Sequence, residues 1–286
     1  MVGGLKMEGR IWIPKNVEKK EACPCGSEKT YEKCCLKKGL KYRNYGKNHE
    51  DKNILIEESE CDREYRKITG VVLDTINKAD MENGLSVSYG VESLKQLYGL
   101  YEDSISIFSK YSSCTKGCSQ CCHMYVDLTA MEAEVIRKFV IENFTNEEIE
   151  KIMCRLEENK DLVPDYRELV GLEKMSDQLD SYWSKQIPCP FLNEEKECGI
   201  YQVRPVKCRT FMAFSKEENC TYEDNKSFRI ETPMGNGLLI GADAISTNVK
   251  RFKDLKAEDK KTNLLALKKS IYHWFKDGFN NIDRSI

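Results

Sequence analysis

Residues 114–122 read CTKGCSQCC, so that Cys114, Cys118, Cys121 and Cys122 fall within nine positions. The opening stretch MVGGLKMEGRIWIPKNVEKK has neither an apolar h-region nor a small-residue cleavage site, and we therefore expect a cytoplasmic protein in a reducing environment. Clustered thiols in such an environment are typical of metal or redox sites rather than of disulfides. On a helix, at about 100° per residue, the four sulfurs share one face, although a glycine and two serines equally allow a loop that leads into a helix. The segment therefore predicts a metal centre.

The composition is that of a heavily charged globular chain. Its 286 residues include 14 Cys and 3 His, 32% are charged, and 45 basic against 47 acidic side chains give a net charge of −2. This length suggests one or two domains. A run of roughly 20 apolar residues is missing, so we expect neither a membrane-spanning helix nor a membrane partner.

A second cluster lies near the amino terminus. The segment CPCGSEKTYEKCC contains Cys23, Cys25, Cys34 and Cys35 in the spacing C-x-C-x8-C-C. A structural zinc site needs four soft donors, commonly supplied as two pairs. Between residues 15 and 47 there are ten Lys or Arg and four Glu, a local charge of +6 that suits a negatively charged zinc–thiolate site. We predict that these four thiols bind zinc.

Further cysteines lie downstream in a region rich in proline. Cys189 belongs to PCPFL, Cys198 to CGIY and Cys208 to RPVKCR, and the prolines hold the chain extended beside the sulfurs. Two arginines of this region are predicted either to neutralise a multi-thiolate centre or hold an anionic ligand, or to form structural salt bridges. The predicted metal ligands of this larger part are Cys114, Cys118, Cys121, Cys122, Cys189, Cys198 and Cys208, with Tyr201, Arg204 and Arg209 as their neighbours, while the roles of His123 and Cys220 stay open.

The apolar pattern predicts helices over most of the larger part. Helical spacing recurs over residues 65–76 and 94–108, and capping boxes begin at Thr129 and Thr145. A final amphipathic helix is expected over about residues 261–276. The sequence Gly-Asn-Gly at 235–237 predicts a β-hairpin between 228–232 and 238–240, and Cys61 and Cys154 are interpreted as small core residues.

These elements predict a mainly α fold. It consists of a small N-terminal zinc-binding module, a larger helical domain with irregular cysteine-rich metal-binding loops, and the short β-hairpin. The predicted boundaries are 15–45 for the module, 46–56 for a polar linker rich in Asn and Lys, and 57–286 for the metal-chelating domain, whose motif core is 114–211.

The first cluster resembles a known family. Residues 22–39 are similar to the SEC-C motif, the zinc module at the carboxyl end of the SecA translocation ATPase, in the CPCGS start, in Lys29 and Tyr31, and in the closing cysteine pair. SecA more often closes this motif with Cys-His, and Cys35 occupies the last place here. The resemblance implies a docking element for a protein partner. The local charge would suit an acidic protein, and less well the ribosome or another RNA.

Residues from about 114 to 211 resemble the YkgJ-type cysteine-cluster family, whose domain is described as zinc- or iron-chelating. The shared marks are CxxxCxxCC, the helix start LTAME at 128–132, CPFL, CxIY, RP and CR. The resemblance implies chelation and names no reaction. Flagellin lysine N-methylase shares only the cysteine frame, which implies an alternative: an iron–sulfur-dependent enzyme that uses SAM to modify a protein.

The metal of the larger domain is predicted to be a [4Fe-4S] cluster or a second zinc, because four cysteines suit both. We favour a single cluster held by the cysteines of 114–122 with help from the later group, since the paired knuckles of structural zinc are missing. The spacing C-x3-C-x2-C also occurs in radical SAM enzymes. The chain that follows reads as helical rather than as alternating strands and helices, and the adjacent fourth thiol could close the open iron position.

The predicted function is that of a cytoplasmic metal-binding protein, recruited to a protein partner by its zinc module. The alternative is the SAM-dependent enzyme named above. The sequence contains no GxSxG, P-loop or HExxH motif, and whether the chain is an enzyme stays open.

Overall fold

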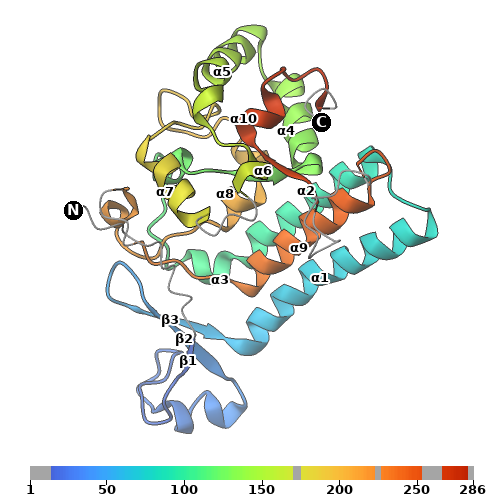
Figure 1. Cartoon of the computed structure of the whole chain (residues 1–286). Coiled ribbons are helices and arrows are strands. Elements are labelled where there is room, and N and C mark those ends of the chain that lie inside the picture. The colour runs from blue at the N-terminus through green and yellow to red at the C-terminus, as the bar shows by residue number, and fades with distance from the viewer. Residues whose placement is uncertain (1–13, 170–174, 223–226, 253–265, 283–286) are drawn as a thin grey trace.

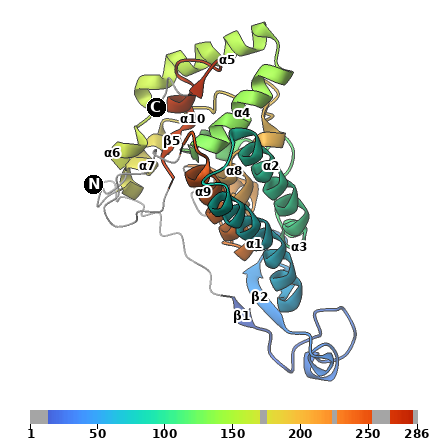
Figure 2. The same ribbon diagram turned by 90° about the vertical axis from the view of Figure 1, so that its right-hand side faces the viewer.

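The computed structural model describes residues 14–169, 175–222, 227–252 and 266–282. Helices predominate in these residues, as the sequence predicts, and two small sheets accompany them. A small module with a three-stranded sheet lies at one end of the molecule, and α5 (Asn146–Asn159) lies at the other (Figure 1, Figure 2). Within the described ranges, no helix combines the length and the apolar character needed to cross a bilayer.

The three-stranded sheet joins the amino-terminal module to the helices. Its order is β1 (Lys15–Asn16), β2 (Tyr42–Lys47) and β3 (Asn53–Glu57), with both pairs antiparallel. The side chain of Asn48 closes the turn between β2 and β3, because its Oδ1 accepts hydrogen bonds from the backbone N–H groups of residues 50 and 52. The segment predicted as a linker, 46–56, is therefore mostly a β-hairpin. Its polar composition reflects the exposed turn of that hairpin.

Three helices form the body next to this sheet. They are α1 (Glu58–Met81), α2 (Val87–Ser104) and α9 (Pro233–Asn248), and each contacts the other two. The helix predicted over 65–76 is confirmed within α1, and most of the one predicted over 94–108 lies in α2. The short helix α3 (Ser106–Ser109) continues that second pattern after a break at Ile105.

The β-hairpin predicted around residues 235–237 is wrong, because these residues belong to α9. Thr232 caps the helix by accepting a hydrogen bond from the N–H of Gly235, and Pro233 occupies its first turn. A Cβ on Gly241 would lie 2.8 Å from a methyl carbon of Leu97 and from one of Val72. The glycines serve close helix packing here, not a turn.

Both predicted capping boxes are confirmed. Thr129 and Glu132 form the first at the start of α4 (Ala130–Asn143), and Thr145 and Glu148 form the second at the start of α5. The strand β4 (Asp127–Thr129) precedes α4 directly and pairs antiparallel with β5 (Lys268–Ser270).

The carboxyl-terminal region is less helical than expected. Of the helix predicted over 261–276, residues 261–265 lie outside the described residues, 268–270 form β5, and only α10 (Ile271–Phe275) is helical. The remaining helices and 3-10 turns are η1 (Tyr31–Lys33), η2 (Leu36–Lys38), η3 (Gln120–His123), η4 (Lys160–Leu162), α6 (Tyr166–Leu169), α7 (Met175–Ser184), η5 (Tyr201–Val203), α8 (Val206–Thr210) and η6 (Glu217–Cys220).

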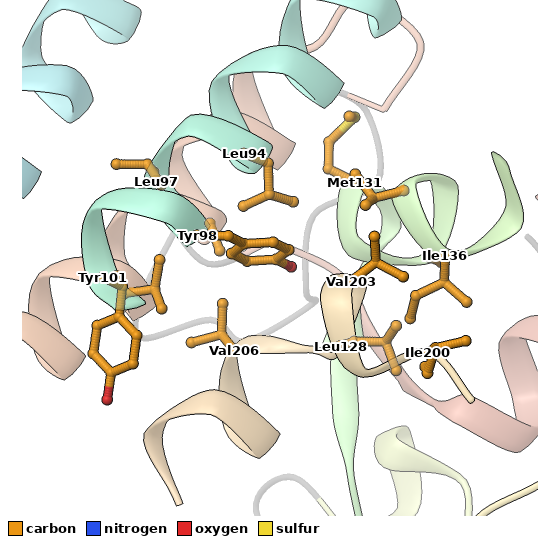
Figure 3. Packing of buried hydrophobic residues seen from close by; sticks show 14 of the residues in the cluster. Leu94, Leu97, Tyr98, Tyr101, Leu128, Met131, Ile136, Ile200, Val203 and Val206 are labelled. Carbon is orange, nitrogen blue, oxygen red and sulfur yellow. The ribbon is translucent and has the colours of Figure 1, made fainter. Parts of the chain in front are cut away.

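A single apolar core fills the helical body, and a smaller one fills the amino-terminal module. In the large core, the inner face of α2 points at Met131 of α4 and Val206 of α8, with the ring of Tyr98 between them (Figure 3). Cys61 is buried in this core, as predicted. The same prediction is wrong for Cys154, whose side chain is exposed on α5. The side of α5 that faces the core is therefore formed by other residues of this helix.

Candidate metal centres

The four cysteines of the amino-terminal module converge on one point. Their sulfur atoms all lie within 4.8 Å of one another. The Sγ of Cys25 lies 3.4 Å from that of Cys23 and 3.6 Å from that of Cys34. A tetrahedron of sulfurs about 2.3 Å from a zinc ion has edges of about 3.8 Å. The donor set and its spacing therefore fit a tetrahedral metal site.

Local backbone structure builds this site. The N–H of Gly26 donates to the carbonyl of Cys23 at 3.0 Å, and Gly26 has a φ of +79°, which a residue with a side chain rarely adopts. The buried hydroxyl of Tyr31 donates to the carbonyl of Leu40 and accepts from the N–H of Tyr42, both at 3.0 Å. These bonds fix the cysteine loop on strand β2.

The four thiols differ in pKa because their environments differ. Hydrogen bonds from Ser27 lower the pKa of Cys25 to about 6, so this thiol is ionised at neutral pH. Burial raises the pKa of Cys35 to about 12. A buried thiol next to a thiolate gives up its proton when a cation binds between them. The module is therefore suited to exchange protons for a metal ion.

A second set of sulfurs, the inner thiol group, consists of Cys121, Cys122, Cys189, Cys198 and Cys208, all partly buried. It is assembled from distant segments of the chain. The N–H of Cys189 donates to the carbonyl of Cys122 at 2.7 Å, a β-bridge joins Leu192 to Cys198, and Cys208 lies on α8.

The inner thiols oppose one another's ionisation. The pKa of Cys122 is raised by its hydrogen bond with Cys121, then by burial, and also by Cys189 and Cys198. Burial raises the pKa of Cys189 to about 12 and is also the largest cause of the raised pKa of Cys208. In the described part of the chain, only the amino-terminal four meet the 4.8 Å spacing, so the inner sulfurs are spread more widely.

The first two cysteines of CTKGCSQCC and Cys220 form a further set, the outer thiol group, which adjoins the inner one: Cys114 acts electrostatically on Cys118 and Cys220, and Cys121 also acts on Cys220. Cys114 is exposed, and its sulfur accepts a hydrogen bond from the N–H of Ala213 at 3.4 Å. Burial raises the pKa of Cys118 to about 11, with Glu217 and Cys114 as charged neighbours. Cys220 is buried on η6. The nine-residue motif thus spans two groups of thiols, and His123, in η3, has its Nδ1 3.2 Å from the carbonyl of Ser119.

Two arginines flank the inner thiol group. Nη2 of Arg204 lies 2.9 Å from Oε1 of Glu102, and Nη1 of Arg209 lies 2.5 Å from the same oxygen. The guanidinium of Arg204 covers the ring of Tyr201 at 3.8 Å, and that of Arg209 covers the ring of Tyr98 at 3.9 Å. The predicted structural salt bridges are therefore present.

These arginines also act on the thiols. The positive charge of Arg204 favours the ionised forms of Cys121, Cys198 and Cys208, which opposes the effect of burial on the pKa of the latter two. The first alternative for these arginines, neutralisation of a multi-thiolate centre, is thus compatible with the salt bridges.

Acidic residues that the sequence did not single out hold α8 in place. The buried carboxylate of Glu132 accepts the N–H of Val206 through Oε1 and that of Thr129 through Oε2, both at 2.8 Å. Buried Asp127 pairs with Lys207. The sequence did contain a signal for a further role of Glu132, because this residue ends LTAME, one of the marks shared with the cysteine-cluster family. Glu102 carries no such signal, since it reads as an ordinary acid of an amphipathic helix.

Comparison with known families finds a match in each of the two cysteine-rich regions. Residues 113–227 match the family model described as "CxxCxxCC: Putative zinc- or iron-chelating domain", and residues 20–37 match the SEC-C motif. The chain therefore carries a segment that matches this cysteine-cluster family model and a segment that matches the SEC-C motif. The resemblances to a cysteine-cluster chelating domain and to the SEC-C motif are confirmed, and with the converging cysteines they indicate a metal-binding protein.

The chelating domain as matched covers less than half of the chain, and it begins after α2 and ends before α9. Glu102 and the glycine-rich packing of α9 therefore lie outside it. No curated protein and no solved structure matches the chain.

Proposed function

We propose that this protein binds zinc in its SEC-C motif and a second metal centre at the inner thiol group, and that the SEC-C motif docks it onto an acidic protein partner. The convergence of Cys23, Cys25, Cys34 and Cys35 carries the proposal. The sulfur–sulfur separations of 3.4 and 3.6 Å are close to those of a zinc tetrahedron.

We propose that the inner thiol group binds one metal centre, and we favour a [4Fe-4S] cluster over zinc. Zinc and the cluster both take four thiolates, and either leaves about two negative charges. The wider spread of these sulfurs supports the larger inorganic core. The inner thiol group has five cysteines, and either metal centre needs four thiolate ligands, so one of the five thiols is not a ligand.

The docking role rests on charge and position. The exposed side chains of the SEC-C region include six lysines, at positions 19, 20, 29, 33, 37 and 38, against four glutamates, at positions 18, 21, 28 and 32. They lie at the end of the molecule away from α5, where a partner can reach them (Figure 1). Clustered lysines attract an acidic surface and steer its approach. An RNA partner is the competing outcome, and a salt-dependent gel shift with RNA would favour it.

Metal analysis tests the two centres separately. The protein is purified without oxygen, and zinc, iron and acid-labile sulfide are measured with the absorption spectrum. We expect one zinc and a brown colour that dithionite bleaches. Replacing Cys34 by Ser should remove zinc alone. Replacing both Cys121 and Cys122 by Ser leaves three inner sulfurs for four positions and should remove the colour alone. Loss of both metals in either variant would contradict the two-centre proposal.

The enzymatic alternative has its own measurement. A SAM-dependent enzyme must bind SAM, so isothermal titration of the anaerobic protein should give a saturable signal. An absence of binding at millimolar SAM would refute that alternative and leave the metal proposal intact.

A further inference from the structure

The segment that carries Cys189 is held by side chains from distant parts of the chain. Pro188 and Pro190 flank this cysteine and have no backbone N–H, so only the N–H of the cysteine remains as a donor there. The proline carbonyl oxygens remain as acceptors. The hydroxyl of Tyr272 donates to the carbonyl of Pro188 at 2.6 Å, and Nη1 of Arg155 donates to that of Pro190 at 3.2 Å. Side chains therefore hold the backbone on both sides of the cysteine.

Arg155 also connects this segment to the loop that ends at Cys198. The same nitrogen, Nη1, donates to the carbonyl of Leu192 at 2.6 Å. Leu192 in turn forms a β-bridge with Cys198, so the arginine holds the start of the loop between them. One side chain of α5 thus positions the backbone of two members of the inner thiol group, Cys189 and Cys198.

Both donor side chains are anchored in the fold. Tyr272 is only 4% exposed and lies on α10, which directly follows β5, and β5 pairs with β4. The indole N–H of Trp274, on the same helix, donates to the carbonyl of Leu128 at 2.8 Å. Arg155 lies on α5, which contacts α10 (Figure 1). The frame around Cys189 is therefore built from two helices and the small sheet.

A fixed frame raises the affinity for a metal, because a ligand that is already ordered loses less freedom on binding. Removing an outer partner that orients a metal ligand typically lowers metal affinity about 10–100-fold. Here the partners act on the backbone beside the ligand. Their removal leaves every thiol in the chain and frees only the segment that presents it.

We propose that Arg155 and Tyr272 are positioning residues that hold Cys189, and through Arg155 also Cys198, in place for metal binding at the inner thiol group. The inference rests on the proposed inner metal centre, and it commits Cys189 to one of the four ligand places. Tyr272 lies beyond residues 113–227, so the segment that matches the chelating family depends on a part of the chain that follows it.

The first test pairs a neutral substitution with a matched control. Tyr272→Phe removes only the hydroxyl donor and changes no charge. Tyr111→Phe is the control, because the hydroxyl of Tyr111 also donates to a backbone carbonyl, that of Leu55 in β3, at 3.3 Å. A difference between the two variants reports where the lost hydrogen bond acts.

The second pair of variants concerns the arginine. Arg155→Gln removes the guanidinium that reaches two carbonyls of the cysteine segment. Arg137→Gln is its control, because Nη1 of Arg137 donates to the carbonyls of Phe279 and Asn280 at 3.4 and 3.5 Å, outside the cysteine segments. Urea unfolding of all four variants gives the loss of stability that accompanies each substitution.

Metal release and thiol labelling are the two measurements. EDTA is added to the full-length protein, purified without oxygen, and the loss of the inner metal is followed by absorption and by zinc and iron content. We expect Tyr272→Phe and Arg155→Gln to release the inner metal about tenfold faster than the wild type, while both controls and the SEC-C zinc keep the wild-type rate. In metal-free protein, iodoacetamide should alkylate Cys189 faster in both variants, as peptide mass spectrometry shows.

A purely structural role gives a different pattern, in which metal release follows the free energy of unfolding. Controls that lose as much stability and release the inner metal as fast would therefore overturn the proposal. Wild-type release from Tyr272→Phe, or an unchanged alkylation rate of Cys189, would overturn it as well. A wild type without an inner metal refutes the proposed centre instead, and the alkylation rate then still reports whether the two side chains hold Cys189.

Discussion

Replacing Glu132 by Ala removes the acceptor of two buried backbone N–H groups, those of Thr129 and Val206. Leaving a buried donor without a partner costs about 1–3 kcal/mol. The two lost bonds are therefore expected to lower the free energy of unfolding by about 2–6 kcal/mol. Because Val206 begins α8, the same variant should also loosen the helix that carries Cys208.

The second capping box provides a matched control. Glu148 makes the same contacts to Thr145 at the start of α5, but it is exposed to solvent, so water replaces its hydrogen bonds. Glu148→Ala should therefore destabilise the protein less than Glu132→Ala. Urea unfolding followed by circular dichroism measures both losses. Equal losses in the two variants would refute the argument that burial sets the value of the box.

The pH dependence of the two variants should have opposite signs. Burial raises the pKa of Glu132 above its ordinary value of 4.5, so its contribution to stability falls as pH rises through the raised pKa. Hydrogen bonds from Thr145 lower the pKa of Glu148, so its contribution is lost as pH falls below about 4.5. The difference between wild type and each variant is measured from pH 3 to 8, so that the range extends below the ordinary carboxyl pKa of 4.5. Parallel slopes would contradict the assignment.

Three other predictions concern the SEC-C module and the helical body. In metal-free protein, iodoacetamide should modify Cys25 first, at a rate that rises through about pH 6, while Cys35, with a pKa of about 12, stays unreactive; peptide mass spectrometry at several pH values checks this order. Gly241→Ala should lower the free energy of unfolding by about 1–3 kcal/mol through overpacking. A Cβ at Gly70 meets no atom within 4 Å, so Gly70→Ala should raise the free energy of unfolding by up to about 1 kcal/mol through helix propensity. Thermal unfolding measures both, and equal effects would show that close packing at α9 is unimportant. Chelation of the amino-terminal zinc should expose residues 17–41 to trypsin while the helical body resists, because two ligands are part of that module's small core; uniform digestion would contradict this.

Local signals explain what the sequence predicted well. The capping boxes at Thr129 and Thr145 depend on residues three apart, and both are present. The four cysteines of the SEC-C motif lie within one short loop, so their spacing alone determines that they can converge. Helical periodicity likewise depends on neighbours within one or two turns, and it located α1 and most of α2.

The misses come from tertiary contacts. Gly-Asn-Gly is typical of a hairpin, but the cap at Thr232 and Pro233 begins a helix, and Gly241 is needed because α9 approaches two other helices closely. Cys154 follows an apolar pattern without facing the core. Glu102 meets its arginines across more than 100 positions of the chain, and a sequence of ordinary composition gives no sign of such a contact.

The strand β3 ends at Glu57 and α1 starts at Glu58, without a connecting loop. Arg43 of β2 forms an ion pair with Glu58, and the hydroxyl of Tyr111 donates to the carbonyl of Leu55 at 3.3 Å, so the joint is braced from two sides. A flexible tether would let a docked partner sample many directions around the second thiol centre. A stiff joint would instead hold that centre at one distance and one orientation from a partner docked on the SEC-C motif.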